Sequence, residues 1–227
     1  MRDGLGFHPL LIEDIRSESH PKVEEHDAHV YMILHGLHPD RLSPDDLQTV
    51  ELDVVLSSRW LLTHQAQPVR AILRTRARLA ADPSLLRRGP AHVAHALIDE
   101  MTDRYLPLME AYATSLDELE MSILQNHGTG ALPRILALKH GLLQVRRIGF
   151  HQRAILRRLA EGRVRFVPSE LTVFFRDVED HFVRAMDLGE AFRDQLASAM
   201  DASLSMQSYR MNEIMKVLTI MSTVMLP

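Results

Sequence analysis

Four acidic side chains of this sequence lie in apolar surroundings. Glu13 and Asp14 are adjacent in a largely apolar stretch, Asp99 follows the apolar run 96–98, and Asp177 follows Phe175 closely. A carboxylate beside an interface between helices is costly unless a cation meets it. From the residues alone, the simpler interpretation is pairing with an arginine, because charged residues usually lie on solvated faces. The candidate arginines are Arg104, Arg176 and Arg184.

Histidines provide a second set of candidate ligands. His26 and His29, like His92 and His95, are separated by two residues, a spacing that can bind transition metals. Neither pair has a third ligand that the sequence places beside it, so we interpret all four as surface or core histidines. His181 differs, because it follows Asp177 by four residues and would share its helix face.

Composition argues against several classes of function. The chain has no cysteine, so it can form neither a disulfide nor a thiolate zinc site. It has no glycine-rich phosphate loop, no Gly-x-Ser-x-Gly motif and no evident nucleophile–base pair, so we do not expect an enzyme. The formal net charge of −4 gives no general attraction to nucleic acid. We expect the basic residues of segment 139–158 to be neutralised by acids of segment 110–120.

The longest of the elements that must position these residues is the C-terminal stretch. Segment 169–226 has no proline and one glycine, and its apolar residues recur at steps of four and three. This predicts one narrow apolar stripe on a helix of roughly 85 Å, too long to be buried within one small domain. The stripe consists of Leu171, Phe175, Val178, Phe182, Ala185, Phe192, Leu196, Ala199 and Met206.

The remaining chain predicts a small sheet and more helices. A short helix over 7–15, a loop over 17–25, a strand over 28–37 and a turn-rich segment over 39–46 are expected, followed by a hairpin of strands 49–57 and 59–65. Helices follow over 68–81, over 90–125 with a kink at Pro107, and over 133–161. The last two should form an antiparallel hairpin, each burying its stripe on the other. The predicted fold is α+β and mostly helical: a small sheet covered by helices, a long antiparallel helical hairpin and a very long C-terminal stalk helix.

Two segments carry a resemblance to a known family. The segment from Asn212 through Lys216 to Ile220, followed by an apolar run, is similar to the junction between stalk and first membrane helix in the CorA family of magnesium and cobalt transporters. The apolar run is half the length of a membrane helix. Segment 8–24 resembles the family's "HPL…ED…PKVE" signature. The resemblance covers nearly the whole chain, from Phe7 to Pro227.

The resemblance implies a role for the candidate residues. Glu13, Asp14, Asp99 and Asp177 match family positions for divalent-cation sites between neighbouring subunits, and His181 could reach the same group. Mg²⁺ takes oxygen ligands and keeps several waters, which suits dispersed carboxylates. At the other end, the resemblance implies that Asn212, Met215, Leu218 and Met225 line the ion path and gate. The alternative there is a continuing coiled-coil core. Lys216 would form a basic ring at the membrane surface, or anchor there by snorkelling.

The resemblance also implies the assembly. It divides the chain into a partial N-terminal α/β domain over 1–82, a helical hairpin over 83–167, and a stalk over 168–227 that enters the first transmembrane helix. Family members form homopentamers in the inner (plasma) membrane, with this portion on the cytoplasmic side. Strands before residue 1, the Gly-Met-Asn motif and the second membrane helix would be missing here. The implied function is sensing and gating for Mg²⁺ or Co²⁺, with bound Mg²⁺ favouring the closed state. The alternatives are a zinc transporter of the same family and a coiled-coil scaffold without an ion role.

Overall fold

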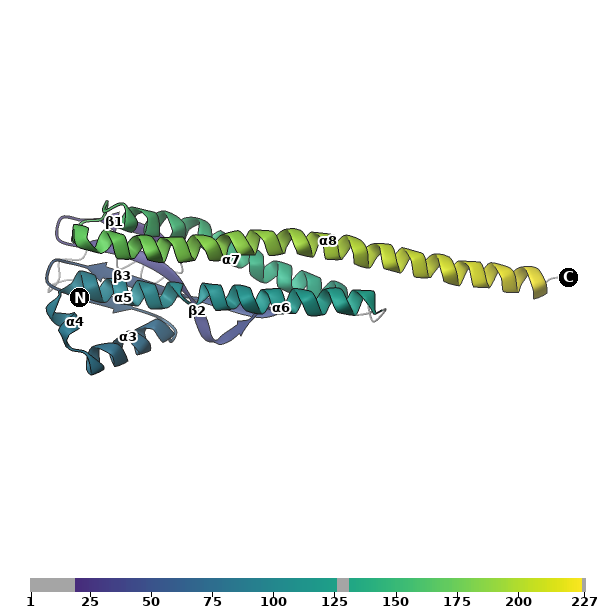
Figure 1. Cartoon of the computed structure of the whole chain (residues 1–227), viewed down its shortest axis with the longest axis horizontal. Coiled ribbons are helices and arrows are strands. Elements are labelled where there is room, and N and C mark those ends of the chain that lie inside the picture. Colours follow the sequence, from purple (N-terminus) through teal and green to yellow (C-terminus); the bar gives the residue numbers. More distant parts are fainter. Residues whose placement is uncertain (1–18, 126–130, 226–227) are drawn as a thin grey trace.

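A sheet at one end of the molecule and one helix along its whole length organise the fold (Figure 1). The computed structural model describes residues 19–125 and 131–225. Its strands are β1 (Lys22–Glu25), β2 (Val30–Ser43), β3 (Asp46–Leu56) and β4 (Leu61–His64), paired antiparallel in the order β1-β2-β3-β4. The α+β fold, mostly helical with a small sheet and a very long C-terminal helix, is confirmed.

The sheet is larger than the sequence predicts. β1 occupies a segment that was expected to be a loop. Its backbone pairs with the edge of β2, and polar residues such as Lys22 and Glu24 gave no sequence signal for a strand. β2 and β3 also continue into the expected turn region, and the chain reverses only between Ser43 and Asp46. Pro39 lacks an N–H for the ladder, and the pairing is irregular between Leu37 and Leu42, which accommodates it.

The sheet has apolar residues on both faces. One face, with Met32, Leu52 and Val54, joins the main core with the helix α5 (Pro90–Thr102). The other carries Tyr31, Ile33 and Val55, against which Trp60 and Leu62 pack. The helix α3 (Arg70–Ala81) and the short helix α4 (Ser84–Arg87) flank α5. This strand alternation is the pattern expected of half-buried and buried strands.

The helix expected over 90–125 is two helices. α5 ends at Thr102, and α6 (Tyr105–Leu124) starts after Asp103 and Arg104. Pro107 explains the break, because a proline ring collides with the carbonyl four residues earlier in a continuous helix, here that of Asp103. The break therefore precedes the proline instead of forming a kink at it, and Pro107 lies in the first turn of α6, where its missing N–H costs nothing.

The long helix α8 (Thr172–Met225), preceded by a 3-10 turn at Ser169–Leu171, packs against two others. α6 and α7 (Ala131–Ala160) run antiparallel, and each contacts α8 more than it contacts the other, so the expected burial of one hairpin stripe on the other is wrong. The predicted stripe of α8 is confirmed, because its residues are buried, except Phe192 and Met206, which are half-buried. α8 continues well beyond the ends of α6 and α7 (Figure 1).

Candidate functional site

Asp99 is an acidic residue in an otherwise apolar part of α5. Its neighbours Leu97, Ile98 and Met101 are buried, and Asp99 itself is half-buried at the contact between α5 and α8. Burial raises the pKa of Asp99 above its ordinary value, and the charges of Asp103 and Asp177 raise it further against the opposing effects of His95 and Arg78. The ionised carboxylate is therefore unfavourable here unless a cation meets it.

Three further side chains gather beside Asp99. Nδ1 of His181 lies 3.9 Å from Oδ1 of Asp103, and its Nε2 lies 3.9 Å from Oδ1 of Asp177. We call Asp99, Asp103, Asp177 and His181 the α5–α8 acidic group. Three of its members were singled out from the sequence. Asp103 was missed, although it follows Asp99 by four residues and so lies on the same side of the helix end.

The arginine pairing that the sequence favoured is not found. Within residues 19–125 and 131–225, no arginine lies within ion-pair distance of Asp99 or Asp177. Asp103 and Asp177 are mostly exposed, with 57% and 71% of their side chains accessible, so water reaches the group. Among the described residues, the group therefore presents three carboxylates with His181 between two of them and no arginine within ion-pair distance.

The donor set suits a hydrated hard cation better than a tightly held one. In the part of the chain that the structure describes, no three His, Cys, Asp or Glu side chains are arranged to hold a metal ion by themselves. Mg²⁺ retains several waters and needs only one or two direct carboxylates. The acidic group of one chain therefore does not form a closed metal site by itself among the described residues. Glu13 and Asp14 lie outside the described residues.

The other histidines lie in different surroundings. The His95 ring packs against Phe175 at 4.9 Å and Phe174 at 5.8 Å, and burial lowers its pKa despite the nearby Asp99. His92 lies 3.7 Å from Glu170. His26 and His29 have ring centroids 4.8 Å apart in the turn between β1 and β2. Both pairs therefore lie in packed or half-buried surroundings rather than in a described metal site.

The distal part of α8 is apolar and exposed. Met215, Leu218 and Met225 have 58%, 59% and 81% of their area accessible, and Asn212 and Lys216 are exposed too. No helix in the described ranges is long and apolar enough to cross a membrane. All side chains of residues 211–225 are exposed, and a contiguous exposed apolar patch is typical of an interaction surface.

The basic residues of α7 are neutralised in part, by partners the sequence did not predict. Only Arg134 pairs with α6 among the described residues, its Nη2 lying 2.7 Å from Oε2 of Glu118. Arg146 pairs with Glu190 of α8 at 2.9 Å, and Arg158 with Glu25 of β1 at 2.7 Å. The expected mutual neutralisation of α6 and α7 is therefore largely wrong, because the facing helix is α8.

Comparison with known proteins identifies the family of this chain. The family model described as "CorA-like Mg2+ transporter protein" matches residues 1–227. The chain belongs to the CorA family. The cobalt/magnesium transport protein CorA of Thermotoga maritima is 30% identical over 224 residues, covering 98% of this chain and 64% of that protein. The chain thus spans less than two thirds of that relative's length.

Solved structures share the fold of this CorA-family chain. The complete structure of the CorA magnesium transporter from Methanocaldococcus jannaschii matches with a TM-score of 0.83 at 23% identity, over 98% of this chain and 70% of that one. The ZntB cytoplasmic domain from Vibrio parahaemolyticus matches with a TM-score of 0.70 at 17% identity, over 90% and 80% of the two chains. The long stalk helix and small sheet are therefore the architecture of this family.

Proposed function

We propose that this chain is the ion-sensing and gating portion of a divalent-cation transporter for Mg²⁺, with Co²⁺ as a second substrate. The observation that carries the proposal is the α5–α8 acidic group: a half-buried carboxylate with a raised pKa and two further carboxylates, without an arginine partner among the described residues. Family membership supports this class of transported ion, since the Thermotoga maritima relative is a cobalt/magnesium transport protein.

In the proposed mechanism, Mg²⁺ binds between subunits and holds the closed state. Asp99 and Asp177 would provide one side of the site, and Glu13 and Asp14 of an adjoining copy the other. With the ion bound, the carboxylates attract a shared charge, and without it they repel one another across the interface. The ion therefore favours one of two assemblies by its differential affinity. His181 would orient Asp103 and Asp177 towards the ion.

The distal half of α8 would transmit this change to the gate. Its exposed apolar side chains can be covered by copies of the same helix around an axis, which supports a homopentamer in the full-length protein. Asn212, Met215, Leu218 and Met225 would then line the ion path, where rings of Met and Leu close by dewetting. Lys216 would lie at the membrane surface, with this portion of the protein on the cytoplasmic side of the plasma membrane.

Zinc is the second candidate ion, because a specific contact favours it. His181 places a ring nitrogen beside each of two carboxylates, and nitrogen ligands suit Zn²⁺ more than Mg²⁺. The likeness to a ZntB cytoplasmic domain supports the same alternative at the level of the fold. A His181→Ala variant separates the two ions, because it should abolish a Zn²⁺ response and leave a Mg²⁺ response largely intact.

The deciding experiment measures oligomeric state and ion response together. Native mass spectrometry should show a pentamer, and Mg²⁺ at ten times its Kd should stabilise the protein by about 1.4 kcal/mol per site. For a chain of this size the thermal midpoint should rise roughly 3–6 °C.

A double variant, Asp14→Ala with Asp177→Ala, should lose this rise. The matched control is Asp201→Ala, which removes an exposed acid of the same helix. A confirmed pentamer without any ion response would refute ion sensing and leave the scaffold interpretation.

A further inference from the structure

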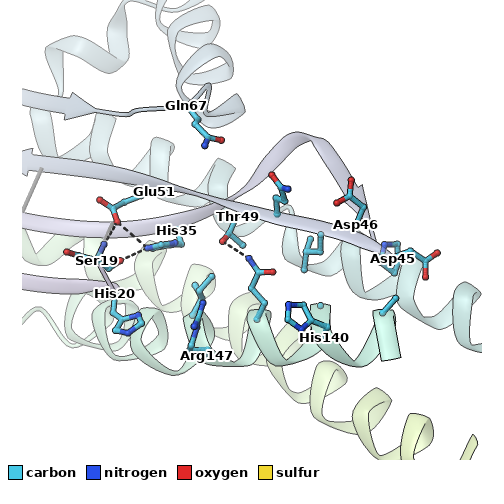
Figure 2. Close-up of a pocket in the computed structure, with 17 residues that line it drawn as sticks. Ser19, His20, His35, Asp45, Asp46, Thr49, Glu51, Gln67, His140 and Arg147 are labelled. Carbon is cyan, nitrogen blue, oxygen red and sulfur yellow. Dashed lines mark hydrogen bonds and ion pairs between the residues drawn. The ribbon is translucent and has the colours of Figure 1, made fainter. Parts of the chain in front are cut away.

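A second feature of the molecule lies away from the α5–α8 acidic group and shares no residue with it. A cavity of about 850 Å³ lies between the β2–β3 hairpin and α7 (Figure 2). This volume is within the range of pockets that hold small organic molecules. Polar side chains make up most of its lining, so its ligand must offer hydrogen bonds rather than a large apolar surface.

The α7 wall presents one arginine and two neutral hydrogen-bonding side chains to the cavity. His140, Gln144 and Arg147 recur at steps of four and three, which places them on one side of the helix facing the hairpin. Within the described ranges, Arg147 has no ion pair, and α7 contains no acidic residue that could provide one. In Figure 2, Arg147 lies between His140 of the same helix and His20, which precedes β1.

The opposite wall supplies neutral hydrogen-bonding groups at the centre. Nε2 of Gln144 donates to Oγ1 of Thr49 at 3.2 Å, a contact that joins the two walls. The acidic residues of the lining lie towards its ends in Figure 2, with Glu51 at one end and Asp45 and Asp46 at the other. Glu51 already accepts the Ser19 N–H at 2.7 Å and lies 3.6 Å from the His35 ring. The central section is therefore the part with unused positive charge.

We propose that this cavity binds a small organic phosphate, with the phosphate group on Arg147 between His20 and His140 and its hydroxyl-bearing part against Thr49 and Gln144. An arginine fork binds phosphate oxygens through paired hydrogen bonds. Three donor side chains offer one for each of the three outer oxygens of a phosphate monoester, which also carries more negative charge than a carboxylate. The volume exceeds that of inorganic phosphate, which leaves space for a sugar or nucleoside. The face of α7 that carries Leu142 and Val145 is buried in the main core with α8, so a bound ligand would join the sheet to the helix that supports the stalk.

Isothermal titration tests the proposal. The 227-residue chain is titrated with ribose 5-phosphate, ADP and inorganic phosphate in buffer with EDTA, so that no divalent ion contributes. We expect ribose 5-phosphate or ADP to bind more tightly than inorganic phosphate and to raise the thermal midpoint. Arg147→Gln should weaken binding about tenfold to a hundredfold, because it removes charge-assisted hydrogen bonds.

Arg153→Gln is the matched control. Arg153 is an exposed arginine of the same helix that does not line this cavity and has no ion pair among the described residues. Its removal should leave the affinity unchanged. His140→Ala should also weaken binding, and it tests the proposal in case Arg147→Gln does not fold. Equal weakening by Arg153→Gln would show general attraction to a basic helix and overturn the proposal. No binding of either organic phosphate at about 10 mM, the weak end of small-ligand affinities, would overturn it too.

Discussion

Two glycines in helix interiors should respond in opposite directions to the same substitution. Gly141 of α7 lies against the β2–β3 hairpin, where a Cβ would overlap the Tyr112 hydroxyl and lie 3.1 Å from the Pro44 carbonyl oxygen. The Tyr112 hydroxyl donates to that carbonyl at 3.3 Å, and both groups are buried. In α8, a Cβ on Gly189 would make only ordinary contacts, 3.5 Å from Sδ of Met109 and 3.9 Å from Leu142.

The magnitudes follow from these distances. Replacing a helical glycine by alanine gains about 1 kcal/mol from helix propensity, which both sites receive. At Gly141, overpacking against a fixed ring and backbone costs about 1–3 kcal/mol, and loss of a buried hydrogen bond adds about 1 kcal/mol. Gly141→Ala should therefore lower the free energy of unfolding by about 1–3 kcal/mol, whereas Gly189→Ala should raise it by up to about 1 kcal/mol.

Urea denaturation with EDTA present measures both changes, and thermal midpoints should move by about 2–4 °C per kcal/mol. Adding Tyr112→Phe to Gly141→Ala should recover part of the loss, because the nearest remaining ring atom lies 3.5 Å from the added Cβ. Equal effects of the two alanines, or a Gly141→Ala protein as stable as the original, would show that α7 does not approach the hairpin this closely.

Two further predictions concern the α5–α8 acidic group and the distal stalk. The raised pKa of Asp99 means that the native state binds its proton more tightly than the unfolded chain, so its ionisation lowers stability as pH rises through that pKa. Asp99→Asn should therefore be more stable than the original at pH 7 in EDTA, and this gain should vanish below about pH 4 in a series of urea titrations. Ending the chain after Met206 removes side chains that are almost all exposed, so the thermal midpoint should stay within about 1 °C while self-association in sedimentation experiments decreases.

Periodicity in the sequence identified the buried faces of the helices but not what covers them. The stripe of α8 was predicted residue by residue, because a helix that buries one side must repeat its apolar residues every three or four positions. The same repeat does not say which helix is the partner, and here α8 packs along both α6 and α7. The position of Asp103 beside Asp99 depends on where α5 ends, a boundary that Pro107 determines from four residues away.

Charge on α7 shows why part of the candidate sites required the structure. A 30-residue helix without an acidic residue can form ion pairs only with groups outside the helix, and the sequence alone establishes this. Glu161, which directly follows the helix, pairs with Arg157. Three partners that are distant in sequence, Glu25, Glu118 and Glu190, come from a strand and two different helices. Their assignment depends on three-dimensional packing and not on sequence spacing. Once they are assigned, the arginine that faces the polar cavity is left without a protein partner in the described part of the chain. An exposed arginine beside an open polar cavity is a position where an anion can bind at little desolvation cost, since both groups stay partly hydrated in the complex.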